Sequence, residues 1–252
     1  EEFGYDEINL DLGCPSKKVQ RNKFGACLIK EPKLVVDCLS EMKSKTKLPV
    51  TVKTRIGYDQ VEDYEHLYNF INLLKETGVK TFIIHARKAM LGKFTPKQNL
   101  NIPPLKYEMV YKLKEDFKEL DIIINGGITS TEQIKNHIEK VDGVMMGRSI
   151  YHSPYLLADI EKDIFSNEYV PSRQEVVEKL IIYLKNEIKK GTRVNQVMRH
   201  TLGLFHGQTG SSFWKRYLSE NMCVRDADIQ KINHILDKVK LNHVTQSSGQ
   251  ID

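Results

Sequence analysis

Short apolar segments alternate with longer segments of helical periodicity over the first 150 residues. The apolar segments are rich in β-branched residues and lie at residues 7–12, 49–56, 81–85, 121–124 and 143–146. Between them, apolar residues recur every three or four positions, which is the spacing of an amphipathic helix. Because parallel neighbours in a sheet need crossover connections, this alternation predicts an α/β fold with a parallel sheet.

The helical segments also carry signals at their ends. One apolar repeat begins with Val35, behind Pro32, a residue that suits a first helical turn. A second repeat begins at Leu67 and ends before Gly78. Ser130 with Gln133 has the spacing of a capping box, which marks the start of a further helix.

The strand signal stops after about residue 153, and the rest of the chain is helical in pattern. One long helix is expected between the capping pair Ser172 and Glu175 and the terminator Gly191, and a last helix near Asp226. We therefore expect a barrel-type catalytic domain at residues 1–155, a helical domain at 156–245 and a disordered tail at 246–252.

Five parallel strands fit either an open doubly wound sheet or part of an eight-stranded TIM barrel. The first glycine-rich turn is not G-x-G-x-x-G, which weakens the doubly wound reading. Polar residues follow nearly every strand, as they do at the active face of a barrel. A partial barrel is the prediction, with about three further β/α units expected upstream of residue 1.

Charge is distributed unevenly along the 252 residues, whose net charge is +5. Residues 188–219 and 12–30 contain no Asp or Glu but several Lys and Arg. Either stretch alone could be a solvated face, but two together favour a polyanionic partner, with nucleic acid the leading candidate.

The apolar runs and the cysteines of the sequence indicate whether the protein enters a membrane and which compartment it occupies. No apolar run approaches the roughly 18 residues of a membrane span, so we expect no membrane partner. Four cysteines without a CxxC pair indicate a reducing compartment and no disulfide framework or metal site. A cytoplasmic location and a monomer are expected, and an organellar location stays open because the chain begins without Met.

Cys14 is the first candidate for chemistry. It follows the first strand in a turn held by Gly13 and Pro15, and four basic residues come after it. A buried structural role is the alternative, and it is the better reading for Cys38, which lies on an apolar helix stripe. A thiol is mostly protonated at neutral pH, so Cys14 suits a general acid better than a nucleophile.

Other strand ends carry groups that suit a cofactor with one phosphate and an electron-rich ring. Lys53, in Val52-Lys53-Thr54-Arg55, could offset negative charge on a reduced ring, and His85 could bond its polar edge. Glycine-rich turns follow the last two strands, where barrels often bind phosphate through backbone N–H groups. These turns are Asn125-Gly126-Gly127 and Gly147-Arg148.

Together these motifs closely resemble the tRNA-dihydrouridine synthases. The resemblance runs from residue 5 to about residue 240, and Ile102-Pro103-Pro104-Leu105 and Gly203-Leu204-Phe205-His206-Gly207 point to the bacterial-type A subfamily. The remaining motifs that carry it are Gly13-Cys14-Pro15-Ser16, Phe24-Gly25-Ala26-Cys27-Leu28, residues 50–57, His85-Ala86-Arg87-Lys88, residues 124–128 and residues 144–148.

The resemblance implies a TIM barrel that binds FMN, followed by a helical domain that binds tRNA. It implies that NADPH reduces the flavin, that hydride passes to C6 of a uridine at position 20 or 20a of the D-loop, and that Cys14 protonates C5. By motif, the residues that would hold FMN are Lys53, His85, Asn125, Gly126, Gly127, Gly147 and Arg148. By motif, those that would meet tRNA are Asp11, Lys97, Phe213 and Arg216.

The chain departs from the family in two respects. Position 11 is Asp where the family usually has Asn, so the amide donors are replaced by a carboxylate that accepts hydrogen bonds. The family's first strands, which carry further FMN contacts, are not in the sequence, and we expect the chain by itself to bind FMN poorly.

Two other functions fit part of the pattern. A barrel flavoprotein acting on a free pyrimidine would also use a loop Cys, but it would not need the basic helical region. A tRNA-binding module without catalysis is the second alternative.

Among the other aromatic and histidine residues, Trp214 fits a helix core as well as a nucleotide stack, and His137, His152 and His234 are expected at the surface or at caps.

Overall fold

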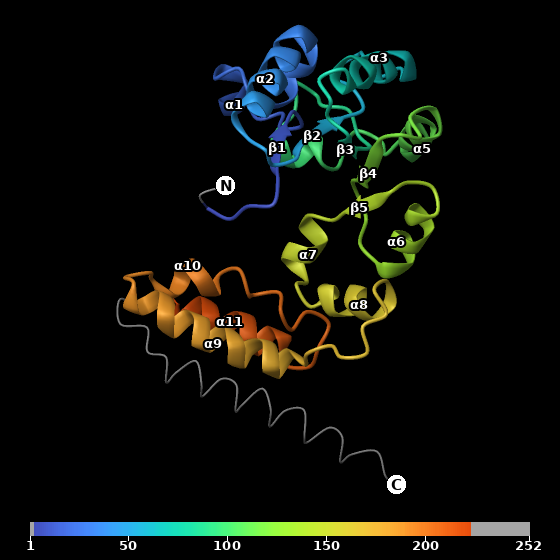
Figure 1. Ribbon diagram of the computed structural model, residues 1–252. Helices are drawn as coiled ribbons and strands as arrows, with labels where there is room; N and C mark the ends of the chain where they lie inside the picture. Colours follow the sequence, from blue (N-terminus) through green and yellow to red (C-terminus); the bar gives the residue numbers. More distant parts are fainter. Residues whose placement is uncertain (1–2, 223–252) are drawn as a thin grey trace. The chain divides into compact units, whose positions relative to one another are not determined.

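A computed structural model describes residues 3–222 of the chain. Its sheet has five parallel strands in the order β1-β2-β3-β4-β5 (Figure 1). Every apolar segment expected as a strand forms one, within one residue at each end, so that prediction is confirmed. The strands are β1 (Ile8–Asp11), β2 (Val50–Arg55), β3 (Thr81–His85), β4 (Asp121–Asn125) and β5 (Gly143–Met145).

The strand order separates the two architectures that the sequence left open. Each strand pairs with the one before it in the chain, and no reversal of order occurs. A doubly wound sheet would contain such a reversal at its switch point, whereas consecutive units of a barrel do not. The sheet is therefore part of an α/β barrel wall, as predicted.

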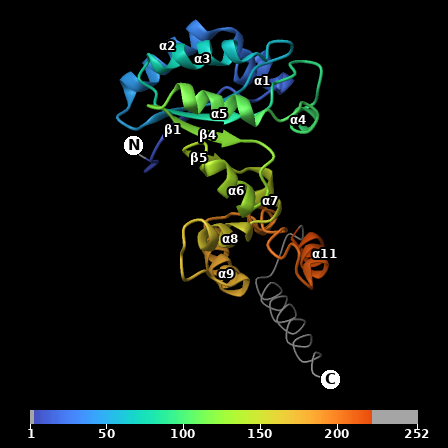
Figure 2. The ribbon, with the colours of Figure 1, turned by 90° about the vertical axis from the view of Figure 1, so that its right-hand side faces the viewer.

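Helices cover one face of this sheet (Figure 2). The helix α2 (Pro32–Lys45) has Pro in its first turn, and its Val35 is fully buried. The helix α3 (Tyr64–Lys75) is capped by Asp63, whose side chain accepts the His66 N–H at 2.8 Å. The other helices that follow strands in this part of the chain are α5 (Tyr107–Asp116) and α6 (Thr131–Ile138).

The two faces of the sheet differ in chemistry because side chains alternate along each strand. One face is mainly apolar, and on it Val52, Phe82 and Ile122 occupy paired positions of three strands and are fully buried. The opposite face carries polar side chains, including Asn9, whose amide donates to Thr51 Oγ1 at 2.7 Å. Other polar residues on that face include Asp11, Lys53, Arg55, His85 and Asn125.

Short elements fill the connections on the side where the strands end. After β1 come the helix α1 (Lys17–Arg21) and the 3-10 helix η1 (Gly25–Lys30). After β3 comes the four-residue helix α4 (Pro96–Asn99), which begins with a capping box formed by Thr95 and Gln98.

The chain divides into two compact units. The first consists of residues 1–128 and 132–146, and the second of residues 129–131 together with the chain from 147 onward. The helices of the second unit are α7 (Arg148–His152), α8 (Leu156–Asp163), α9 (Arg173–Lys189), α10 (Val194–Met198) and α11 (Ser211–Asn221).

The second unit has its own hydrophobic core, formed by α9, α10 and α11. Helix α9 starts with the predicted capping box of Ser172 and Glu175. Trp214 is fully buried and donates its Nε1–H to the Thr201 carbonyl at 3.0 Å, so its role is in the core and not in nucleotide stacking. The helix expected near Asp226, His234 and the tail at 246–252 lie outside the described residues.

Candidate active site

Cys14 lies half-buried in the turn that follows β1. Its carbonyl oxygen accepts the backbone N–H of Ala26 at 2.9 Å. Gly25 has a φ of +71°, and a β-carbon there would lie 2.5 Å from the Cys14 carbonyl oxygen. Only a glycine fits this approach, so the Gly25-Ala26 segment fixes the backbone of Cys14.

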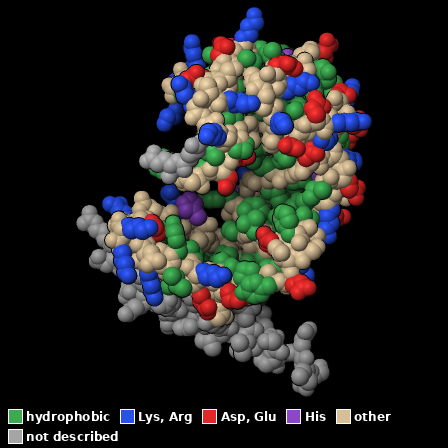
Figure 3. Space-filling model, in the orientation of Figure 1, with side chains coloured by type: hydrophobic (Ala, Val, Ile, Leu, Met, Phe, Trp, Pro, Cys, Tyr) green, Lys and Arg blue, Asp and Glu red, His purple; other side chains and the backbone are tan. Residues whose placement is uncertain are grey.

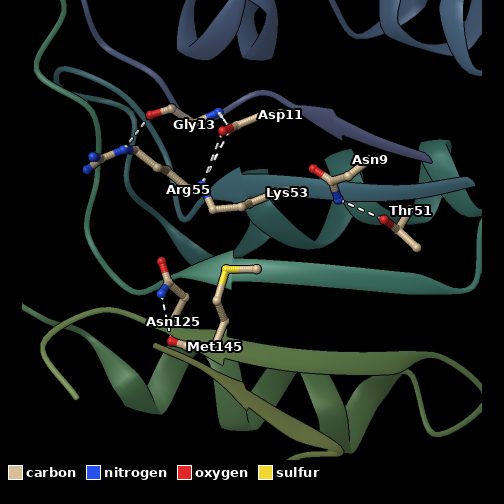
Figure 4. Close-up of polar contacts among 8 residues, drawn as sticks. All are labelled: Asn9, Asp11, Gly13, Thr51, Lys53, Arg55, Asn125 and Met145. Carbon is tan, nitrogen blue, oxygen red and sulfur yellow. Dashed lines mark hydrogen bonds and ion pairs between the residues drawn. The ribbon is translucent and has the colours of Figure 1, made fainter. Parts of the chain in front are cut away.

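Asp11 joins this turn to the neighbouring strand (Figure 4). Its Oδ1 accepts the N–H of Gly13 at 2.8 Å, and its Oδ2 lies 3.4 Å from Lys53 Nζ. Asp11 and Lys53 are also paired in the β1–β2 register. Half of the Asp11 side chain is exposed, so the ion pair itself contributes at most about 1 kcal/mol. The hydrogen bond to Gly13 is the contact that shapes the turn.

Arg55 connects three loops and is only 4% exposed. Its Nε donates to the Gly13 carbonyl at 2.8 Å, and its Nη1 donates to the carbonyls of Lys88 at 3.1 Å and Asn99 at 3.3 Å. Burial lowers the pKa of Arg55 to about 10, while the Asp11 carboxylate acts in the opposite direction, as would a negative charge on Cys14. The guanidinium therefore stays charged at neutral pH.

Arg55 stands in one of the sequence motifs but was not predicted as a site residue. Its acceptors are the backbone carbonyls of residues 42, 33 and 44 positions away in the chain. Every residue has a backbone carbonyl, so the sequence alone does not show which ones Arg55 binds. The spacing from Lys53, which places both side chains on one face of β2, was the available signal.

A row of residues crosses the ends of the strands. The registers pair Arg55 with His85, His85 with Asn125, and Asn125 with Met145. His85 is 8% exposed, and the Asn125 side-chain amide donates to the Met145 carbonyl at 2.8 Å (Figure 4). The structure thus places His85 and Asn125, two of the predicted cofactor residues, at one rim of the sheet, and Lys53 lies on the same face two residues before the end of β2.

The turn after β4 depends on two glycines. Gly126 and Gly127 have φ values of +119° and +72°. A β-carbon on Gly126 would lie 3.3 Å from the His85 ring, and one on Gly127 would lie 2.6 Å from Leu105. The backbone of this turn consequently packs directly beside His85, with Gly127 exposed to solvent.

Tyr107, which sequence reasoning missed, holds the same turn. Its hydroxyl donates to the Gly126 carbonyl at 2.6 Å, and burial raises the pKa of this hydroxyl, which keeps it a donor. The ring of His137 packs edge-on against Tyr107 with centroids 4.6 Å apart. A tyrosine at the first position of a helix gives no sequence signal for such a role.

The expectation that His137 lies at the surface is wrong. His137 is 6% exposed, and its Nδ1 lies 2.7 Å from the hydroxyl of Tyr111. Burial lowers the pKa of His137, so the ring is neutral in the fold at neutral pH. Its position on the buried side of α6 reflects packing against α5, which the periodicity of a short helix does not resolve.

Lys97 is exposed on α4. Its neighbour Asn99 connects this helix to the residues of the sheet. Asn99 is fully buried, accepts the Met90 N–H at 2.6 Å and donates to the carbonyl of Met90 at 3.1 Å. Because Arg55 binds the Asn99 carbonyl, the loop that presents Lys97 is anchored to the same cation as the Cys14 turn.

The other predicted site residues belong to the second unit. Gly147 and Arg148 are exposed and follow β5 in the chain, where Gly147 precedes the first residue of α7. Arg216 is exposed on α11, whereas Phe213 is half-buried and packs against the core of that unit.

Within residues 3–222, no three His, Cys, Asp or Glu side chains are grouped in a way that would hold a metal ion. In the same part of the chain, none of the helices combines the length and apolar character needed to span a bilayer.

Comparison with known proteins gives consistent results. Residues 1–240 match the family model described as dihydrouridine synthase (Dus). A tRNA-dihydrouridine(20/20a) synthase of Synechocystis sp. is 46% identical over 95% of this chain and 72% of its own length. Proteins with the same name from Shewanella oneidensis and Escherichia coli K12 are each 47% identical, over 97% and 95% of this chain and 73% and 70% of their own lengths.

Proposed function

The chain belongs to the dihydrouridine synthase family, as its motifs predicted, and we propose that it reduces uridines in the D-loop of tRNA to 5,6-dihydrouridine. The relatives that it resembles are named for positions 20 and 20a of tRNA, which are the positions we propose for this chain. The A-subfamily motifs of the sequence agree with that choice.

The arrangement around Cys14 is the observation that carries this proposal. A half-buried thiol follows a strand of a barrel wall, and its turn is held by Asp11, Gly25 and Arg55. Catalytic groups of barrels occur at this end of the strands.

The residues at the strand ends suit FMN. Lys53 offers a cation, His85 and Asn125 offer polar side chains, and Gly126 and Gly127 offer a turn without β-carbons where a phosphate can approach the backbone. Gly147 and Arg148 are included on their sequence motif alone. When bound and reduced by NADPH, FMN would supply the hydride that the reaction requires.

In this proposal Cys14 supplies the proton. Reduction of the C5–C6 double bond of uracil adds a hydride at C6 and a proton at C5, so the ring gains two hydrogens and NADPH is oxidised. A neutral thiol can donate the proton and recover it from solvent, which is general acid catalysis. Arg55, held near the thiol by three carbonyls, would stabilise the thiolate left after proton transfer.

The tRNA contacts are proposed from the sequence motifs together with exposure. Lys97 and Arg216 are exposed cations that can meet phosphates, and Asp11 stands at the rim beside Gly13. Phe213 is a weaker candidate because part of its ring packs in the core. We keep the division into a catalytic domain at 1–155 and a tRNA-binding domain at 156–245 as part of this proposal.

Because the chain by itself is expected to bind FMN poorly, the test is an assay of the chain with FMN at saturating concentration, NADPH and an unmodified tRNA transcript, compared with free uridine. We expect dihydrouridine at position 20 or 20a of the transcript and none from the nucleoside. Turnover of free uridine would favour the alternative of a pyrimidine-reducing flavoprotein. Transcript binding without dihydrouridine would favour a non-catalytic tRNA-binding module.

A further inference from the structure

Tyr151, the fourth residue of α7, presents an aromatic ring to solvent in a fixed position. Its residue is 54% exposed, yet its hydroxyl lies 3.2 Å from Nδ1 of His200. The planes of the His152 and His200 rings lie at 74° and 73° to the Tyr151 ring plane, and each centroid is 5.8 Å from that of Tyr151. An aromatic ring that is more than half exposed and is held in place through its hydroxyl and by two neighbouring imidazole rings is suited to stacking.

The partner His200 is itself held in place. Arg199 donates its Nε–H to His200 Nε2 at 3.0 Å. Because Nε2 accepts this hydrogen bond, the neutral imidazole carries its proton on Nδ1 and donates it to the Tyr151 oxygen.

The backbone segments that carry Tyr151 and His200 also pack closely against each other. A β-carbon on Gly203 would overlap the carbonyl oxygen of His152, so the segment after α10 lies directly against the end of α7. This contact fixes Tyr151 and His200 relative to each other, since each lies within three residues of it in the chain.

The surroundings of Tyr151 favour an anionic partner. Arg199 and His200 belong to residues 188–219, which contain no acidic residue. Lys and Arg side chains gather over the α9–α10 end of the unit in Figure 3. An aromatic face beside cations is the combination with which proteins bind unpaired nucleotides.

Two other exposed tyrosines of the second unit provide a contrast. Tyr169 is 67% exposed, but its hydroxyl donates to the Glu175 carboxylate at 2.7 Å. Hydrogen bonds from Tyr169 and Ser172 lower the pKa of Glu175 to about 2, so an anion stands beside this ring at neutral pH. Tyr183, on α9, is 54% exposed, the same fraction as Tyr151. Unlike Tyr151, it is not flanked by two imidazole rings.

We propose that Tyr151, Arg199 and His200, here called the Tyr151 surface, bind an unpaired nucleotide of the tRNA. The base stacks on the Tyr151 ring, and the Arg199 guanidinium pairs with a phosphate beside it. This inference rests on the proposed function, because it takes tRNA as the partner, and it adds a contact that no motif of the sequence assigns.

The test measures the affinity of the full chain for a tRNA transcript by fluorescence anisotropy. Tyr151→Ala removes the stacking face and is expected to raise the Kd at least about 5-fold, the lower range for loss of one base–aromatic stack. Tyr151→Phe keeps the ring and is expected to stay within about 2-fold of the unsubstituted chain. Tyr183→Ala, with the same exposure, is the matched control and is expected to leave the Kd unchanged.

Salt dependence provides an independent readout. Arg199→Gln is expected to reduce the slope of log Kd against log salt concentration by about one, the effect of losing one phosphate contact. Melting temperatures of all variants are compared so that a loss of folding is recognised.

Each contrary result has a distinct meaning. Equal Kd values for Tyr151→Ala and Tyr183→Ala would overturn the Tyr151 surface while leaving the proposed function intact. An equal loss in Tyr151→Phe and Tyr151→Ala would overturn stacking, because the ring is present in one of them. No transcript binding by the unsubstituted chain would overturn the proposed function and the surface together.

Discussion

Gly25 and Cys14 approach so closely that a β-carbon on Gly25 would lie 2.5 Å from the Cys14 carbonyl oxygen. The same β-carbon would lie 3.1 Å from Cβ of Cys14 and 2.9 Å from a methyl group of Val19. The position of the proposed general acid therefore depends on the absence of a side chain eleven residues later in the chain.

Gly25→Ala is expected to displace the Cys14 turn and to lower dihydrouridine formation at least about 10-fold. The backbone conformation with φ of +71° costs about 1 kcal/mol for alanine, and the overlap with Cys14 adds to that cost. Gly92→Ala is the matched control, because Gly92 has a φ of +81° and open space around it. Equal activity and equal thermal stability of the two variants would show that the approach to Cys14 does not matter.

Asp11→Ala is expected to destabilise the Cys14 turn, whereas Asp11→Asn is not. Either Asp or Asn can accept the Gly13 N–H through Oδ1, but Ala leaves it without this acceptor. Chemical denaturation is expected to show that the free energy of unfolding falls by about 1 kcal/mol in Asp11→Ala and by less than half of that in Asp11→Asn. If Asp11→Asn lost as much stability as Asp11→Ala, the ion pair with Lys53 would be the important contact.

Tyr107→Phe is expected to weaken FMN binding about 2- to 10-fold, the effect of one lost hydrogen bond. The variant removes the hydroxyl that holds the Gly126 carbonyl and leaves the ring in place. Riboflavin, which lacks the phosphate, is expected to bind both proteins alike, since its ring would meet Lys53 and His85.

The control for this prediction is Tyr111→Phe, which removes a hydroxyl that faces His137 and not the glycine turn. Flavin fluorescence titration measures all three proteins. If Tyr107→Phe and Tyr111→Phe bind FMN with the same affinity, Tyr107 does not position the turn.

Protonation of His137 is expected to lower the stability of the first unit. Burial lowers its pKa in the fold, with Lys140 adding to the effect, while the unfolded chain titrates near 6.5. As pH falls below about 6.5, the unfolded state takes up a proton that the folded state does not, so stability decreases by up to about 1.4 kcal/mol per pH unit. Denaturation of His137→Gln between pH 7 and 5.5 is expected to show a flatter profile, and a profile parallel to that of the unsubstituted chain would contradict this.

The sequence predicted the fold well because its main signals are local. Strands such as Thr81–His85 are continuous apolar runs, and the capping box at Ser172 and Glu175 is a pattern of four residues. The barrel architecture was favoured by polar residues at the strand ends, and the strand order then decided it.

Candidate site residues were predicted only where a motif marks them. Cys14, Lys53, His85 and Asn125 each stand in a recognisable strand-end pattern, and the rim that they form follows from parallel register. Arg55 and Tyr107 act on backbone carbonyls of distant residues, and such acceptors exist in every sequence. Their roles, like the burial of His137, appear only when the tertiary contacts are known.

The central claim is that Cys14 protonates C5 of the uracil ring, and Cys14→Ala tests it most directly. Cys38→Ala, on the outer helix α2, is the matched control. The measurement is the rate of dihydrouridine formation in a tRNA transcript, with the rate of flavin reduction by NADPH recorded alongside. Loss of a general acid is expected to slow dihydrouridine formation at least about 100-fold in Cys14→Ala while flavin reduction stays unchanged. Dihydrouridine formation by Cys14→Ala at the rate of Cys38→Ala would contradict the claim.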